Sequence, residues 1–229
     1  MQQLQNQLAE VNAKILQACQ NHQRNQSDVQ LLAVSKTHPA TAIENFYALG
    51  QRAFGENYLQ EALTKITQLE NLDIEWHFIG HVQRNKTKLL AENFAWVHGV
   101  DRLIIAERLS NQRPENLAPL NICLQVNIDG QDTKDGCHPH EVSELVTIIS
   151  ALPQLKLRGL MVIPAPDNVQ AFTDAKKLFD EVKTQHQHPE DWDTLSMGMS
   201  GDLDAAIAAG STMVRIGTAL FGARDYSQN

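Results

Sequence analysis

The sequence has few cysteines, and none of them forms a close pair. Its 229 residues include Cys19, Cys123 and Cys137 and contain no Cys-x-x-Cys motif. An odd number of widely spaced cysteines does not fit a closed disulfide framework. Reduced thiols are typical of cytoplasmic proteins, so we expect a cytoplasmic location.

Long apolar runs, metal motifs and an excess of positive charge are also lacking. No stretch approaches 18 apolar residues, and the N-terminal MQQLQNQLAEVNAKILQACQ has neither a basic leader nor an apolar core. We therefore expect no membrane span and no signal peptide. The nine histidines include no HExxH motif, so we expect no metal site. The net charge of −8 argues against binding nucleic acid through its phosphates, but a small anionic ligand needs only a local positive site.

What the sequence does contain is a regular alternation of apolar runs and helical patterns. Residues 2–22 carry one apolar stripe and predict an amphipathic helix. Eight apolar runs of strand length follow, at 30–35, 52–56, 74–80, 95–100, 120–128, 156–163, 194–199 and 212–217. Seven helical patterns separate them, at 40–49, 58–69, 82–93, 102–112, 138–151, 168–185 and 203–209. Such alternation indicates βαβ units and a parallel sheet.

Eight βα units in a chain of this length predict a (β/α)₈ TIM barrel, with a doubly wound open sheet as the alternative. No linker or low-complexity tract divides the chain. We therefore expect a single domain over residues 1–229, with residues 1–25 as an extra helix packed on the barrel. In this fold functional residues lie at the C-terminal ends of the strands, and phosphate is commonly bound after strands 7 and 8.

Two glycine-containing segments follow the last two predicted strands. SMGMSGD (196–202) precedes a helical pattern, and RIGT (215–218) ends strand 8. Glycine lets backbone N–H groups approach an anion, and a helix N-terminus adds a favourable dipole. A plain helix cap by Ser200 or Asp202 also explains the first segment, and a surface salt bridge is the alternative for Arg215. Because the segments follow neighbouring strands, a phosphate site is the better explanation, with Arg215 at the barrel mouth.

Strand 1 ends in a lysine. LLAVSKTHPA (31–40) places Lys36 at the tip of a strand that is apolar on both faces. Such a lysine either reaches water or is kept for its chemistry. Opposite a phosphate site it fits a Schiff base with a phosphorylated carbonyl compound, as in class I aldolases or proteins that bind pyridoxal 5′-phosphate (PLP). His77 on strand 3 is either a packed core residue or part of the site, and Lys134 in the loop after strand 5 is by default solvated.

Five motifs, in this order and spacing, resemble the pyridoxal phosphate homeostasis protein family. They are LLAVSK, FGENYLQEA, EWHFIGHVQRNK, LRGLMVIP and LSMGMSGDLDAAIAAGSTMVRIGTALFGAR. The resemblance covers about residues 6–226. It implies a TIM barrel of the alanine racemase N-terminal domain type and a protein that holds, buffers and delivers PLP inside the cell.

The resemblance also implies which residues bind PLP. They are Lys36 for the internal aldimine, Arg215 opposite the pyridine nitrogen, Ser200, Gly201, Gly217 and Thr218 for the phosphate, and Asn57 and His77 around the ring. The sequence departs from the family pattern at His38, where a lysine is common. It departs again at residues 80–84, which read Gly-His-Val-Gln-Arg where GPLQ and a serine are common.

Two features predict a carrier rather than an enzyme. Arg215 stays protonated and can only donate to the pyridine nitrogen, which makes the ring a weaker electron sink. The chain ends shortly after strand 8, so we expect no second domain of the kind that gives racemases a tyrosine acid/base. We therefore expect a monomeric PLP carrier in transient contact with PLP-dependent apo-enzymes. A single-domain amino-acid racemase and a class I aldolase are the alternatives.

Overall fold

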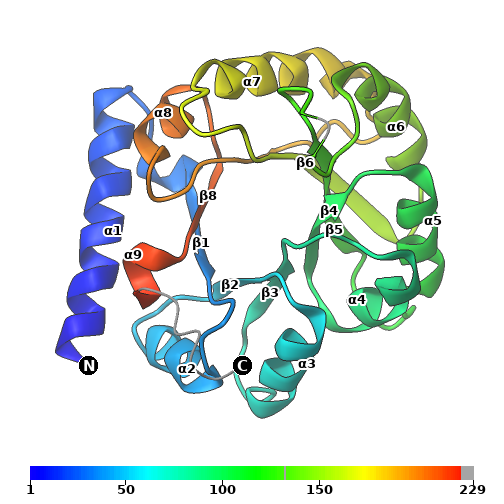
Figure 1. Ribbon diagram of the computed structural model, residues 1–229. Coiled ribbons are helices and arrows are strands. Elements are labelled where there is room, and N and C mark those ends of the chain that lie inside the picture. Colours follow the sequence, from blue (N-terminus) through cyan, green and yellow to red (C-terminus); the bar gives the residue numbers. More distant parts are fainter. Residues whose placement is uncertain (132, 223–229) are drawn as a thin grey trace.

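The computed structural model describes residues 1–131 and 133–222, and its strands form a closed barrel (Figure 1). All strands are parallel, each pairs with the next in the chain, and the last closes the ring against the first. Their bounds are β1 (Gln30–Val34), β2 (Ala53–Glu56), β3 (Glu75–Phe78), β4 (Trp96–Val100), β5 (Leu120–Val126), β6 (Leu155–Val162), β7 (Thr194–Ser196) and β8 (Met213–Ile216). The predicted TIM barrel is therefore confirmed, and the open sheet is excluded.

Helices cover the outside of the barrel. They are α2 (Ala40–Ala48), α3 (Leu59–Gln68), α4 (Thr87–Asn93), α5 (Leu103–Gln112), α6 (Val142–Ile149), α7 (Gln170–Val182), α8 (Leu203–Ala208) and α9 (Thr218–Phe221). Short 3₁₀ turns at Arg84–Lys86, Pro139–Glu141 and Lys183–Gln185 occupy one end of three of the predicted helices. The short helix α9 is not among the predictions, because four residues are too few to show a helical period.

The N-terminal helix α1 (Gln2–Asn21) lies against the outer helices α8, α9 and α2 (Figure 1). Its buried stripe includes Val11, Ile15 and Cys19, spaced as one face of a helix requires. After the helix, Arg24 Nη1 donates to the carbonyl oxygens of Ile207 at 3.0 Å and Ser211 at 2.6 Å. The guanidinium thus satisfies one carbonyl group in the last turn of α8 and one in the segment between α8 and β8, and it fixes the N-terminal segment to the barrel.

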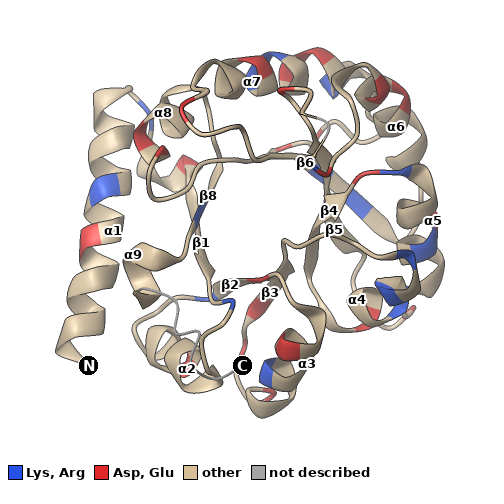
Figure 2. Ribbon diagram, in the orientation of Figure 1, with Lys and Arg blue, Asp and Glu red and all other residues tan. Residues whose placement is uncertain are grey.

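The barrel interior is separate from the main hydrophobic core. The main core lies between strands and helices, whereas alternate residues of the strands point inward and form two small clusters. The inward clusters are Leu32, Val34, Ala53, Ile79 and Met213, and Trp96, Cys123 and Met161. Charged residues lie on the outer helices and on the connecting loops, and the strands carry few of them (Figure 2). Within the described part of the chain, no helix is long and apolar enough to cross a membrane.

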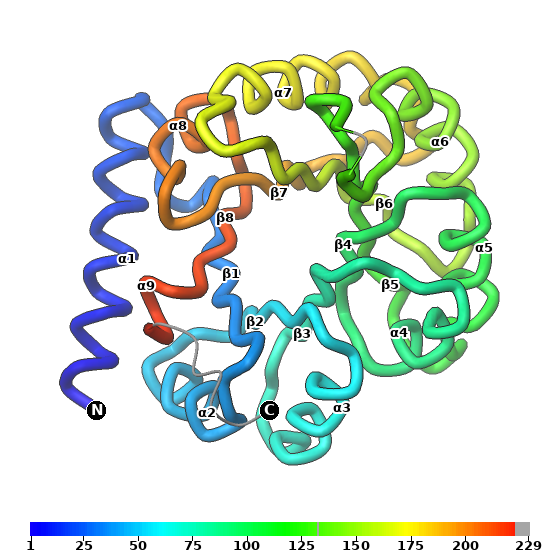
Figure 3. The backbone as a smooth tube through the Cα atoms, in the orientation of Figure 1, coloured from blue at the N-terminus to red at the C-terminus, as the bar shows by residue number. Residues whose placement is uncertain are grey.

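The loops after β7 and β8 lie beside the end of β1. Figure 3 follows the chain from β7 around α8 and back into β8, which is the neighbour of β1 in the barrel. The contact is close at the end of β8, where a Cβ atom on Gly217 would lie 3.3 Å from the carbonyl oxygen of Val34. The three segments therefore form one continuous part of the barrel mouth.

Candidate functional site

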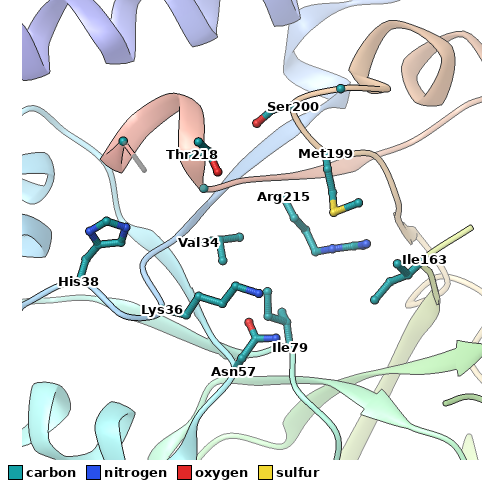
Figure 4. A pocket seen from close by; sticks show the side chains of 13 residues that line it. Val34, Lys36, His38, Asn57, Ile79, Ile163, Met199, Ser200, Arg215 and Thr218 are labelled. Atoms are coloured by element: carbon teal, nitrogen blue, oxygen red, sulfur yellow. The ribbon is translucent and has the colours of Figure 1, made fainter. Parts of the chain in front are cut away.

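A cavity of about 270 Å³ opens at the C-terminal ends of the strands (Figure 4). This is a small volume for a ligand pocket and suits a compact ligand. Seven of the eight predicted site residues line it: Lys36, Asn57, Ser200, Gly201, Arg215, Gly217 and Thr218. Residues far apart in the sequence thus meet where the strand-end rule of this fold predicts.

One side of the cavity, the lysine side, consists of Lys36 and Asn57. Lys36 is half-buried, and its side chain extends into the cavity towards Ile79 and Arg215 (Figure 4). The next residue, Thr37, has φ of 65°, which is a strained conformation for a β-branched residue. Its amide donates to Glu61 Oε1 on α3 at 2.7 Å. Helix α3 therefore holds the turn that presents the lysine.

A buried ion cluster lies beneath this turn. Lys65 Nζ on α3 donates to Glu56 Oε1 at 2.8 Å, to Glu61 Oε1 at 2.5 Å and to the Ser35 carbonyl at 2.9 Å. Ser35 Oγ also donates to Glu56 Oε1 at 2.5 Å. Burial raises the pKa of Glu56, and the charge of Lys65 opposes that shift. Because each buried charge needs its partner, the cluster fixes the end of β1 to β2 and α3.

Asn57 is placed by a close backbone contact. A Cβ atom on Gly80 would lie 2.4 Å from the carbonyl oxygen of Asn57, so only glycine permits the two loops to approach this far. Among the described residues, the buried Oδ1 atom of Asn57 has no hydrogen-bond partner. An unpartnered buried oxygen at a cavity edge is suited to accept a hydrogen bond from a ligand.

The opposite side, the amide side, consists of Ser200, Gly201, Gly217 and Thr218. The first two precede α8, and the last two begin α9. Within residues 1–131 and 133–222, the amides of Ser200, Gly201 and Thr218 donate to no protein acceptor. The hydroxyl groups of Ser200 and Thr218 lie on this side in Figure 4. Converging N–H and O–H donors at two helix starts are suited to an anion such as phosphate.

Glycine is required at one position in the loop that leads to the amide side. Gly198, which leads into the Ser200 loop, has φ of 96°, and a Cβ atom there would lie 2.5 Å from the Cβ of Ala206. Any larger residue would push α8 away from the loop. In the same loop Asp202 Oδ1 accepts from the Met199 amide at 2.6 Å. The loop shape is therefore set by one glycine and one aspartate.

Arg215 lies between the two sides, with 5% of its surface exposed. Its Nη1 donates to the Ser196 carbonyl at 2.7 Å and to Ser196 Oγ at 2.9 Å, and its Nη2 donates to the Val162 carbonyl at 3.0 Å. Burial lowers the pKa of Arg215 to about 10, so the group is still protonated at neutral pH. The guanidinium is therefore a fixed positive donor in the cavity.

His77 is not among the residues that line the cavity, and its place around the ligand ring stays a prediction. It is fully buried inside the barrel, where its ring stacks on Trp96 with centroids 5.1 Å apart. It lies hydrogen-bonded to His98 and Glu75, at 2.9 and 2.8 Å. The sequence leaves open whether His77 is a packed core residue or part of the site, because the strand pattern does not show how far below the mouth the side chain lies.

Two further residues named from the sequence lie near the mouth. His38 lines the cavity, and its ring stacks on Phe221 with centroids 5.1 Å apart. Lys134 is not among the lining residues; its Nζ donates to Asp129 Oδ2 at 3.2 Å and to the Ile163 carbonyl at 2.9 Å. Asp129 also accepts from the Ala165 amide at 2.5 Å, so this lysine connects the loops after β5 and β6. In the described residues no group of three His, Cys, Asp or Glu side chains could hold a metal ion.

The sequence reasoning missed the residues that support the site. Glu61 lies within the motif FGENYLQEA, but nothing in that motif marks it as a support, and Lys65 lies outside the motifs. The available signal is that Lys65 falls between Ala62 and Leu69 on the buried face of α3. A lysine on an apolar helix face indicates a buried partner, but the partner itself cannot be read from the sequence.

The arrangement combines a primary amine, a fixed cation and a set of amide and hydroxyl donors in one small cavity. The amine can react with a carbonyl group, and the donors can bind an anion. The site therefore fits a small phosphorylated carbonyl compound.

Comparison with known proteins agrees with this geometry. The family model for the alanine racemase N-terminal domain matches residues 8–225. A pyridoxal phosphate homeostasis protein of Pseudomonas aeruginosa is 53% identical over 224 residues, which cover 96% of this chain and 95% of the relative. The protein with the same name from Escherichia coli K12 is 50% identical over 236 residues, which cover 100% of both chains. The solved structure of PipY from Synechococcus elongatus PCC7942 with PLP bound has a sequence 36% identical to this one and a TM-score of 0.81. The match covers 96% of this chain and 100% of that chain.

Proposed function

Since the chain belongs to the alanine racemase N-terminal domain family and, within it, to the pyridoxal phosphate homeostasis proteins, we propose that it binds PLP and holds, buffers and delivers this cofactor. The observation that carries the proposal is the meeting of Lys36, Arg215 and the amide side in one cavity. PLP is an aldehyde with a phosphate group, so it can condense with a primary amine and release one water.

Each side of the cavity has a separate task in this proposal. Lys36 Nζ supplies the amine for the aldehyde, and Ser200, Gly201, Gly217 and Thr218 supply the donors for the phosphate. The unpartnered Asn57 Oδ1 accepts a hydrogen bond beside the lysine. The residues present therefore fit PLP in both its reactive group and its charge.

Arg215 favours a carrier over most PLP enzymes in our proposal, although this contact alone does not exclude racemisation. A guanidinium that stays protonated can only donate, so it binds the ring nitrogen as an acceptor and disfavours a proton there. Most reactions of PLP enzymes require the ring to draw electrons from the substrate, and an unprotonated ring does so less well. The chain's own chemistry thus favours holding the cofactor over turning over a substrate.

Amino-acid racemisation is the second candidate, because His38 also lines the cavity and its imidazole could accept a proton. In Figure 4, however, the ring of His38 is directed away from the end of the Lys36 side chain. A base that shares a substrate with Lys36 would have to point into the same space. The carrier function is therefore our first choice.

Delivery and turnover can be separated by two assays. The protein loaded with PLP is mixed with an apo-form of a PLP enzyme, and the recovery of that enzyme's activity is followed against an equal concentration of free PLP. We expect recovery from the loaded protein and no change in the ratio of D- to L-amino acids when it is incubated alone. Steady racemisation at rates above about one turnover per second, the lower end of ordinary enzyme rates, would contradict the carrier function.

The setting of this function is also part of the proposal. We place the protein in the cytoplasm, because Cys19, Cys123 and Cys137 are free buried thiols. We propose that barrel and N-terminal helix act as one domain and that the protein is a monomer that contacts apo-enzymes transiently. Size-exclusion chromatography with light scattering measures the molar mass in solution and tests whether the protein is a monomer.

A further inference from the structure

A chain of hydrogen bonds runs through the barrel interior beneath the cavity. We call it the interior relay, and it consists of Glu75, His77, His98, Ser196 and Arg215. His98 on β4 bonds to Ser196 on β7, and these strands are not neighbours, so the link crosses the inside of the barrel. His77, His98 and Ser196 are fully buried. The relay therefore connects the N-terminal end of β3 to Arg215 in the cavity.

Each link has hydrogen-bond length. Arg215 Nη1 lies 2.9 Å from Ser196 Oγ, and that oxygen lies 3.2 Å from His98 Nδ1. His98 Nε2 lies 2.9 Å from His77 Nδ1, and His77 Nε2 lies 2.8 Å from Glu75 Oε1. The four links use both ring nitrogens of both histidines.

The carboxylate at one end of the relay fixes the direction of the bonds between neutral rings. Glu75 can only accept, so a neutral His77 carries its proton on Nε2 and accepts at Nδ1 from His98 Nε2. A neutral His98 then accepts at Nδ1 from the hydroxyl of Ser196, whose oxygen accepts from Arg215 Nη1. One carboxylate thus leaves a single tautomer for each neutral histidine.

The charges of the groups agree with this direction. Burial lowers the pKa of His98 well below its usual range and lowers that of His77, so both rings are neutral at pH 7. The hydrogen bond from His77 lowers the pKa of Glu75, so this side chain is a carboxylate. Glu75 is partly open to solvent, with 41% of its side chain exposed, and also accepts from Gln30 Nε2 at 3.3 Å. A carboxylate that water can reach avoids the cost of a fully buried charge.

We propose that Glu75, His77, His98 and Ser196 are positioning residues for Arg215. The carboxylate orders the two imidazoles, the imidazoles order the serine hydroxyl, and the hydroxyl always offers a lone pair to Arg215 Nη1. Together with the two backbone acceptors, this keeps the guanidinium in one orientation towards the cavity. Only the effect on PLP rests on the proposed function; the direction of the relay belongs to the protein alone.

The first test determines the tautomers of His77 and His98 in the protein without any ligand. Protein labelled with ¹⁵N-histidine is studied by two-bond ¹⁵N–¹H correlation NMR between pH 6 and 8, with the two signals assigned from the His77→Gln and His98→Gln variants. We expect both rings to be neutral and protonated on Nε2. A His98 ring protonated on Nδ1, or on both nitrogens, would overturn the proposal.

A variant at the lower end tests the role of the carboxylate. The amide of Glu75→Gln can either accept or donate, so both directions of the relay become possible. We expect the His98 signals to change from one tautomer to a mixture of two. Signals identical to those of the unaltered protein would show that Glu75 does not set the direction and would overturn that role.

The second test asks whether the relay acts through Arg215. We expect Ser196→Ala to weaken PLP binding about tenfold, because one hydrogen bond to a charged group is lost. In an Arg215→Gln background the same substitution should weaken PLP binding less than about twofold. Equal effects in both backgrounds would overturn the proposal, since a general packing defect does not depend on Arg215. Ser211→Ala is the matched control, because Ser211 is also fully buried but bonds to the Met197 carbonyl outside the relay. If the unaltered protein binds no PLP, the proposed function fails, and the NMR tests still decide on the relay.

Discussion

The two sides of the cavity are held in different ways. The turn that carries Lys36 rests on side-chain charges, Glu56, Glu61 and Lys65, which are buried or half-buried. The amide side rests on backbone groups, short helices and glycine. A reacting amine must occupy one position, and strong directional contacts provide that. An anion accepts bonds from any converging donors, so backbone amides are sufficient.

The largest effect is expected from removing the amine itself. Lys36→Ala should weaken PLP binding by more than about a hundredfold, because covalent attachment is lost. Binding of pyridoxine 5′-phosphate, which has the phosphate but no aldehyde, should change less than threefold, since the amide side is intact. Both affinities can be measured by calorimetry. Lys88→Ala, which removes an exposed lysine on α4, is the control and should change neither. Equal losses for both ligands would show that the two sides do not act separately.

Breaking the ion pair beneath the lysine side should cause a large loss of stability. Lys65→Met leaves Glu56 as a buried charge without its partner and should lower the free energy of unfolding by about 3–5 kcal/mol. The double variant Glu56→Gln with Lys65→Met should be more stable than Lys65→Met alone, because no unpaired charge remains. Urea denaturation measures both. On the amide side, Thr218→Ala should cost less than about 0.5 kcal/mol, because Thr218 is exposed. Similar costs on the two sides would contradict the comparison.

A milder substitution on the amide side sharpens the same comparison. Ser200→Ala removes one donor to an anion and should weaken PLP and pyridoxine 5′-phosphate by the same factor, about tenfold. Fluorescence titration with each ligand measures the two factors. A loss confined to PLP would place Ser200 with the lysine rather than with the phosphate.

The smallest effect concerns the histidines below both sides. Burial lowers the folded-state pKa of His98 and His77, so below about pH 6.5 the unfolded chain binds more protons than the folded one. Stability is therefore present above that pH and is lost as the pH falls. Denaturation of His98→Gln between pH 5.5 and 7.5 should show a shallower dependence. The exposed His140→Gln should match the unaltered protein, and an unchanged slope in His98→Gln would contradict the burial argument.

The parts of the structure that could be predicted are those that follow from local pattern. Strand and helix alternation predicts the barrel, and the strand-end rule then brings Lys36, Arg215 and the Ser200 loop together. The depth of His77 and its bond to His98 could not be predicted, because both depend on how the strands are staggered around the barrel. The Lys65–Glu56 pair depends on how α3 packs against β2. Neither contact leaves a motif in the sequence.

The central claim is that Lys36 is the amine that binds the aldehyde of PLP. Protein loaded with PLP is reduced with borohydride, digested and mapped by peptide mass spectrometry. The account predicts one phosphopyridoxyl increment, on the peptide that contains Lys36. The increment on another lysine, or no increment at all after PLP is added, would contradict it.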